Sequence, residues 1–330
     1  SNMKKNLFFV GIAAAAMLVS CSNDETVEIP QSKAIKFENF VNTSTRGIAD
    51  DITKDNITNF SVYGFMTNVS GQIFTNEAVI GGGSDWNYTN TQYWASDKDY
   101  WFSAIAPTTG AQWTYDVNNT TEGGIITFEN KDGKQDLLYA YSGKIHCNDP
   151  SLQDKVGFTF NHLLSRVKFN FTNNMGNNNT KLVVKDVTIT DANGKATCDV
   201  SKSEKVWTLT EDNTTGNLVF DAVPDEETKI ENNKSIATDH KYMIPQNQAY
   251  KLTFTVEMYQ GEVLANTYTH TDIVVPQTNM VAGNSYVFNA TLNSENIDPE
   301  GKLYPIEFTV TDIPEWNDEW EAGAVTVPEM

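Results

Sequence analysis

The most specific chemistry in the sequence is at Cys21, which ends an apolar leader. The leader starts with the basic pair Lys4 and Lys5 and continues with an almost unbroken apolar run over residues 7–19. A run of about a dozen apolar residues fits the h-region of an export signal and is too short to cross a bilayer. A small residue before a cysteine at this point is the lipobox pattern of bacterial lipoproteins. We therefore predict a lipoprotein signal peptide over residues 3–20, with a diacylglycerol attached to the Cys21 thiol. The alternative is an ordinary signal peptide that contains a cysteine.

A second candidate site for chemistry is the Arg46-Gly47 peptide bond. Arg46 is the only arginine before Arg166, and the four residues that precede it are small and polar. Exposed polar loops are preferred sites of proteolysis, so an arginine-specific protease has one early target here. The alternative is that Arg46 is simply a solvated surface residue.

The segment between Cys21 and Arg46 contains a strand-like run over residues 34–41, with Ile35 and Phe37 on one face. Cleavage after Arg46 would release this strand with the tether, which together span residues 21–46. Loss of the strand would expose apolar surface, whose burial is worth roughly 25 cal/mol per Å², and unpaired backbone groups. An incoming strand could fill that space by β-augmentation.

No catalytic, cofactor-binding or metal-binding motif is found in the sequence. The phosphate-loop, dinucleotide, zinc-protease and serine-hydrolase patterns are all absent. Acidic pairs such as Asp50-Asp51 lack the spacing of a calcium loop and are better explained as solvated charge. Cys147 and Cys198 have no metal or redox spacing. They could form a disulfide outside the cell, although two buried free thiols fit the sequence better.

The charge of the chain excludes one class of partner. The 23 basic residues are outnumbered by 43 acidic residues, giving a net charge of −20. Phosphate backbones would repel such a chain, so nucleic acid is not an expected partner. The acidic residues just after Cys21 fit either a surface-export signal or a solvated tether.

Alternating polar and apolar residues predict an all-β fold. The clearest examples lie at residues 167–171, 252–258 and 306–310, and turn-forming Asn, Gly and Asp clusters separate such runs. The length suggests two domains. We place them at residues 47–160 and 161–293, followed by a turn-rich linker and a C-terminal strand pair within residues 294–330.

An ordered set of segments resembles the fimbrillins, the lipoprotein-derived subunits of type V pili in anaerobic gut and oral bacteria. In chain order, these segments are Cys21, Thr45-Arg46-Gly47, Phe60-Ser61-Val62-Tyr63-Gly64-Phe65, Tyr100-Trp101-Phe102-Ser103-Ala104 with Pro107, Asp136-Leu137-Leu138-Tyr139-Ala140, Phe160-Asn161-His162-Leu163-Leu164, Met243-Ile244-Pro245-Gln246 and Gly283-Asn284-Ser285-Tyr286.

This resemblance implies two transthyretin-like Greek-key β-sandwich domains in tandem and an assembly route. The lipid-anchored precursor reaches the outer membrane, an arginine-specific protease cuts after Arg46, and the freed groove accepts a strand from another pilus subunit. The candidate donor side chains come from the two C-terminal strand-like runs and are Ile306, Phe308, Val310, Val325 and Val327. If these runs instead complete the subunit's own sheet, a tip or accessory role follows.

A competing hypothesis is a surface glycan-binding lipoprotein, since such proteins share the leader and the sandwich domains. Exposed aromatic rings stack on sugars, and the N-terminal half is rich in them. Trp86, Trp94 and Trp113 are its candidate surface residues. Residues 100–102 are more simply explained as core. A glycan-binding lipoprotein has no need to lose its first strand, and this separates the two hypotheses.

Overall fold

The computed structural model describes residues 32–41, 57–82, 85–117, 123–220, 228–301 and 304–313, and every regular element in these ranges is a β-strand. The all-β prediction is confirmed. The strands form four sheets around three buried apolar cores. Within the described residues, no helix is long and apolar enough to span a membrane.

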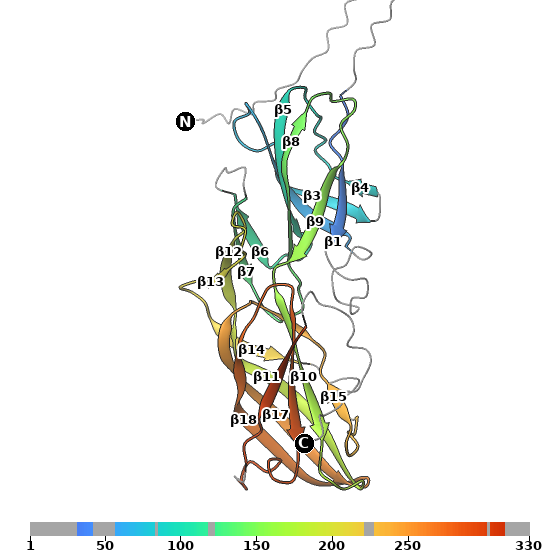
Figure 1. The fold of residues 1–330 in the computed structure, drawn as a ribbon, viewed down its shortest axis with the longest axis vertical. Helices are drawn as coiled ribbons and strands as arrows, with labels where there is room; N and C mark the ends of the chain where they lie inside the picture. Colours follow the sequence, from blue (N-terminus) through green and yellow to red (C-terminus); the bar gives the residue numbers. More distant parts are fainter. Residues whose placement is uncertain are drawn as a thin grey trace, which may run out of the picture. The chain divides into compact units, whose positions relative to one another are not determined.

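The first sheet has seven strands and curls around one core. Its order is β1 (Phe37–Val41), β9 (Val156–His162), β8 (Leu138–Cys147), β5 (Lys98–Ala106), β2 (Asn59–Met66), β3 (Phe74–Gly82) and β4 (Asp85–Asn87). The terminal strands β1 and β4 approach each other (Figure 1). The sheet therefore wraps around a core rich in aromatic side chains. The buried face predicted for residues 34–37 is confirmed, because Ile35 and Phe37 are both in this core.

A small sheet packs on the other face of the central strands. It comprises β13 (Trp207–Leu209), β12 (Lys195–Asp199), β7 (Ile125–Glu129) and β6 (Trp113–Asp116). Tyr63 and Ile105 from the first sheet share a core with Phe128 and Trp207 from this one. Strands β7 and β12 pair directly. Backbone hydrogen bonds therefore join a strand before residue 160 to one after it, although the sequence suggests a domain boundary at that residue.

The two remaining sheets face each other across the third core. One contains β15 (Ser235–Ala237), β10 (Ser165–Asn173), β19 (Ser285–Leu292) and β20 (Phe308–Ile313), with β16 (Lys241–Met243) also paired to β10. The other contains β14 (Thr215–Val219), β11 (Thr180–Asn193), β17 (Asn247–Gln260) and β18 (Val263–Asn279). The alternation predicted at residues 167–171 and 252–258 is confirmed, because every second side chain of both runs lies in this core or, at Met258, is partly buried against it.

Cys147 and Cys198 are free and buried, each in a different core. Burial raises the pKa of the Cys198 thiol to about 12. Both cysteines therefore act as small apolar core residues.

Candidate functional site

The first strand and the residues just before it are hydrogen-bonded on both sides. On one side β1 runs parallel to β9, with Phe37 opposite Val156, and the Val156 N–H donates to the Lys36 carbonyl (2.8 Å). On the other side Ala34 forms an antiparallel bridge with Tyr93. We call the space occupied by residues 33–38 the seat. Because β1 is joined to β9 by hydrogen bonds and not by a hairpin, nothing covalent within the seat retains the strand.

The side chain of Phe37 fills an aromatic pocket, which we call the Phe37 pocket. Its ring lies 5.5–6.4 Å, centroid to centroid, from five others: those of Phe60, Phe74, Tyr88, Phe102 and Phe158. Phe37 is 1% exposed and Ile35 is fully buried. Gly64 makes room for the pocket wall, since a Cβ there would lie 2.9 Å from the rings of Phe74 and Phe102. Such edge-to-face and stacked contacts add to simple area burial.

Residues 88–94 cover the open side of the seat, and we call them the clasp. The Tyr88 hydroxyl donates to the Ile35 carbonyl (2.6 Å), and the Ile35 N–H donates to the Gln92 carbonyl (2.8 Å). The Trp94 N–H donates to the Lys33 carbonyl (3.0 Å). Burial raises the pKa of Tyr88, so the hydroxyl stays protonated and available as a donor. The sequence shows that aromatic residues are dense here. It does not predict that they hold the first strand, because these hydrogen bonds come from an irregular segment.

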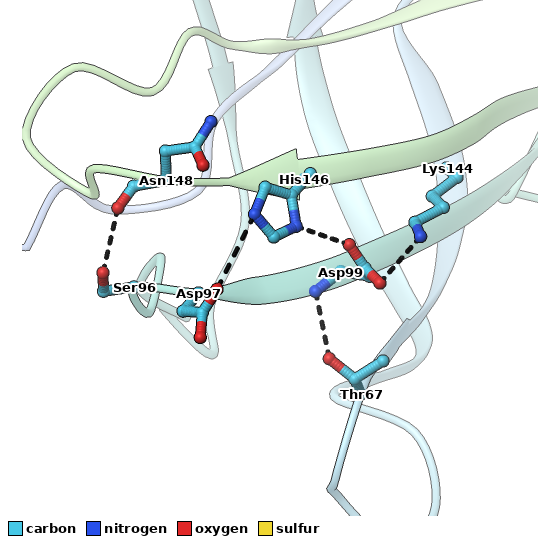
Figure 2. A network of polar contacts seen from close by, with 7 residues as sticks. All are labelled: Thr67, Ser96, Asp97, Asp99, Lys144, His146 and Asn148. Atoms are coloured by element: carbon cyan, nitrogen blue, oxygen red, sulfur yellow. Dashed lines mark hydrogen bonds and ion pairs between the residues drawn. The ribbon is translucent and has the colours of Figure 1, made fainter.

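A polar network anchors the chain just after the clasp (Figure 2). Asp99, the second residue of β5, accepts from Lys144 (2.9 Å) and contacts His146 Nδ1 (2.6 Å) on β8. The hydrogen bond from Lys144, and then that from His146, lower the pKa of Asp99. Ser96 Oγ donates to the Asn148 carbonyl (2.9 Å). The network ties the end of the clasp to β8. No group of three or more potential metal ligands occurs in the described part of the chain.

Five of the site residues predicted from the sequence cannot be placed. Cys21, Arg46, Gly47, Val325 and Val327 lie outside the described residues. The first strand ends at Val41, so the Arg46-Gly47 bond lies in the stretch that directly follows it.

The remaining donor candidates lie on or just before β20, which pairs in the subunit's own sheet. This strand is antiparallel to β19 and forms the edge of the sheet. Ile306 is 5% exposed and Phe308 is 6% exposed, with the Phe308 ring 5.8 Å from that of Phe169 and 6.1 Å from that of Phe171. Val310 is 40% exposed. The buried face expected for residues 306–310 is therefore confirmed for Ile306 and Phe308 and wrong for Val310.

The turn-rich connection before β20 is packed and not loose. Ile297 is 3% exposed and belongs to the third core. Asn296 Nδ2 donates to the Thr291 carbonyl (2.8 Å), and the Tyr304 N–H donates to the Glu295 carbonyl (3.2 Å). The turn-rich linker expected after residue 293 is thus hydrogen-bonded near both of its ends.

The aromatic platform expected for glycan binding is not formed. Trp86, Trp94 and Trp113 are 7%, 2% and 9% exposed, and all three are core residues. The prediction that they form a surface for sugars is wrong, because the curled sheet and the small sheet bury them. Tyr100 and Phe102 are fully buried, as expected.

Comparison with solved structures supports the fold. A fimbrial protein from Bacteroides vulgatus is 18% identical, with a TM-score of 0.59 over 84% of this chain and 98% of that one. Proteins assigned to cell adhesion from Bacteroides uniformis and Bacteroides ovatus are 17% and 16% identical, with TM-scores of 0.51 and 0.53. They cover 86% and 88% of this chain, and the matches span 98% and 99% of theirs. Identity this low shows a shared fold alone.

Sequence comparison gives the family. The fimbrillin-like family model matches residues 22–312. The chain belongs to the fimbrillin-like family, and the resemblance stated from the sequence is confirmed. No curated protein matches the chain.

Proposed function

We propose that this chain is the lipoprotein precursor of a pilus subunit, which assembles with other subunits by donor-strand addition after proteolysis at Arg46. Family membership supports a structural or adhesive role at the cell surface and no enzymatic one. The observation that carries the proposal is the seat. It holds a strand that buries Ile35 and Phe37 completely or nearly so, yet this strand is held by hydrogen bonds and packing and by no hairpin to its neighbours.

The proposed cycle follows from that geometry. A lipid on Cys21 holds the precursor in the outer membrane, and the first strand fills its seat during export. Cleavage between Arg46 and Gly47 then cuts the link between this strand and the rest of the sandwich. Loss of the strand exposes the Phe37 pocket and the unpaired edge of β9, which a strand from another subunit covers by β-augmentation.

The direct test is cleavage of the purified precursor with an arginine-specific protease. We expect one early cut, a new N-terminus at Gly47, and oligomers whose size increases with protein concentration in sizing chromatography. The matched control is Arg46→Lys, which keeps the charge and removes the target. If Arg46 is resistant in the folded precursor, or if the cleaved chain stays monomeric after its N-terminal fragment has left, donor-strand assembly does not hold.

Lipidation is tested separately by palmitate labelling in the native host. We expect the wild-type precursor to carry the label and to sediment with the membrane fraction. The Cys21→Ser variant should show neither the label nor the membrane association. Equal labelling of both proteins would contradict the lipid anchor and would not affect the strand-exchange proposal.

A further inference from the structure

Glu77 is a charged residue on the face of β3 that packs on the core of the curled sheet. It lies opposite Val62 in the β2–β3 pair, and Val62 is fully buried in that core. Val79, two residues further along β3, belongs to the same core. Directly paired residues and every second residue of a strand share one face. The Glu77 carboxylate therefore lies on the core side, where a charge is costly unless it is hydrogen-bonded.

A β-bulge places Glu77 on this face. The register of the β2–β3 pair shifts between Val62 and Gly64, whose partners on β3 are Glu77 and Phe74. Asn76, just before Glu77, has a φ of 49° in the left-handed region. The extra residue in β3 reverses the alternation, so that Phe74 and Glu77 share a face although they are three residues apart. Bulges of this kind redirect a side chain.

The partners of Glu77 are three N–H groups of the clasp. Its Oε1 accepts from the backbone N–H groups of Thr89 (2.9 Å) and Asn90 (3.1 Å), and its Oε2 accepts from Asn90 Nδ2 (2.7 Å). Burial acts to raise the pKa of Glu77, but these hydrogen bonds from Asn90 and Thr89 lower the pKa overall. The carboxylate is therefore ionised at neutral pH, and hydrogen bonds to an ionised acceptor are stronger than those between neutral groups.

Glu77 joins the clasp to a part of the fold that stays when the first strand leaves. The hydrogen bonds from the clasp to residues 33–35 exist only while the strand is in the seat. In the described part of the chain, the other hydrogen bonds of residues 89–92 stay within the clasp, as from the Thr91 N–H to the Thr89 carbonyl (3.2 Å), or go to Glu77. Strand β3 is itself paired on both sides, with β2 and β4, so it is a firm support.

We propose that Glu77 is a positioning residue for strand capture, which keeps the clasp in its strand-bonding shape while the seat is empty. This rests on the proposed function and applies to whichever strand enters. An irregular segment without this contact would have to be ordered as the strand binds, and that ordering opposes binding. A clasp already in place presents the Tyr88 hydroxyl and the Gln92 carbonyl where the backbone of a strand needs them.

Hydrogen exchange tests the shape of the empty clasp in protein cut after Arg46 and separated from its N-terminal fragment. The Thr89 and Asn90 N–H groups donate to Glu77, whereas the Trp94 N–H donates to the first strand. We expect Thr89 and Asn90 to exchange within about threefold of their rates in the uncleaved protein, and Trp94 to exchange at least about tenfold faster. Equal acceleration at all three positions would overturn the inference.

The kinetics of capture test the role of the side chain, with a labelled synthetic peptide of residues 32–41 as the probe. Glu77→Val keeps a high β-propensity and removes the acceptors, and we expect it to slow association with the peptide at least about fivefold. Thr75→Val, at an exposed position of the same strand, is the matched control and should stay within about twofold of the wild type. Glu77→Gln keeps an acceptor for the two backbone N–H groups and should lie between them.

The outcomes separate this inference from the proposed function. A residue that only stabilised the sheet would lower the melting temperature of the uncleaved protein and leave the association rate unchanged. If the wild type captures the peptide and Glu77→Val captures it equally fast, the inference is overturned and the proposed function stands. If the wild type does not capture the peptide, the seat does not reopen, and both fall. If Glu77→Val does not fold, exchange in the wild type decides, because it needs no substitution.

Discussion

Phe37 is the side chain on which the seat depends most. It is 1% exposed and contacts five rings, whereas its neighbour Lys36 is exposed. In the uncleaved chain we expect Phe37→Ala to lower the free energy of unfolding by about 3–5 kcal/mol, because the enclosed pocket cannot collapse onto the cavity. Lys36→Ala should change it by about 0.5 kcal/mol or less. Urea unfolding followed by tryptophan fluorescence measures both, and a loss below about 1 kcal/mol for Phe37→Ala would contradict the role of the pocket.

Tyr88 is expected to control how fast the cleaved strand leaves. Its hydroxyl donates to the Ile35 carbonyl, and a hydrogen bond of this kind contributes about 1 kcal/mol. Tyr88→Phe keeps the ring in the Phe37 pocket and removes this bond, together with a longer one that the hydroxyl accepts from the Gln92 N–H (3.4 Å) within the clasp. Release of the N-terminal fragment after cleavage should therefore be about fivefold faster. Tyr93→Phe is the matched control in the same segment, because Tyr93 is 58% exposed. Equal release rates for the two variants would exclude a role of this bond in retention.

At the scale of elements, the sequence predicted several of the strands and the face that each of them buries, except at Val310, which is exposed. Alternation at residues 34–37, 167–171 and 252–256 was sufficient, since one buried face imposes a period of two. Alternation does not show which strands pair with each other in a sheet. The pairing of β7 with β12 joins residues that are about 70 positions apart, and it depends on the shared core around Phe128 and Trp207. The clasp was not predictable for a similar reason, because its bonds come from irregular backbone without a periodic signal.

One ion cluster links three chain segments of the last sandwich. Glu262, in the turn between β17 and β18, contacts Lys181 of β11 (2.9 Å) and also Lys229. The hydrogen bonds from Lys229 and then Lys181 lower the pKa of Glu262 to about 2. A carboxylate with a lowered folded-state pKa contributes stability above its ordinary pKa, and that contribution is lost as the pH falls toward about 2.

We therefore expect Glu262→Gln to lower Tm slightly at pH 6, by no more than about 2 °C, since the group is exposed and screened by solvent. The two Tm values should converge near pH 2, and added salt should reduce their difference at pH 6. Thermal unfolding by circular dichroism at both pH values is the measurement. A difference that persists at pH 2 would mean that Glu262 acts through packing and not through charge.

At the scale of the whole molecule, the arrangement of three separate cores limits what loss of the first strand disturbs. Ile35 and Phe37 belong to the core of the curled sheet, whereas β11 and β17 bury their side chains in the core of the last sandwich. The small sheet lies on the opposite face of the central strands. A subunit built in this way can open one seat while the rest of the fold stays intact. The proposed cycle requires this property, because the subunit would have to stay folded between cleavage and assembly.

Hydrogen exchange tests this separation. Removal of the fragment after cleavage frees the Val156 and Trp94 N–H groups, whose acceptors are the Lys36 and Lys33 carbonyls. We expect faster exchange in β9 and the clasp, and unchanged exchange in β11 and β17, because local opening is confined to the unit that lost its contacts. The control is protein that has been cut but still holds its fragment. If β17 exchanged faster to the same extent as β9, the cores would be coupled, and the cleaved subunit would have to bind its donor strand to remain folded at all.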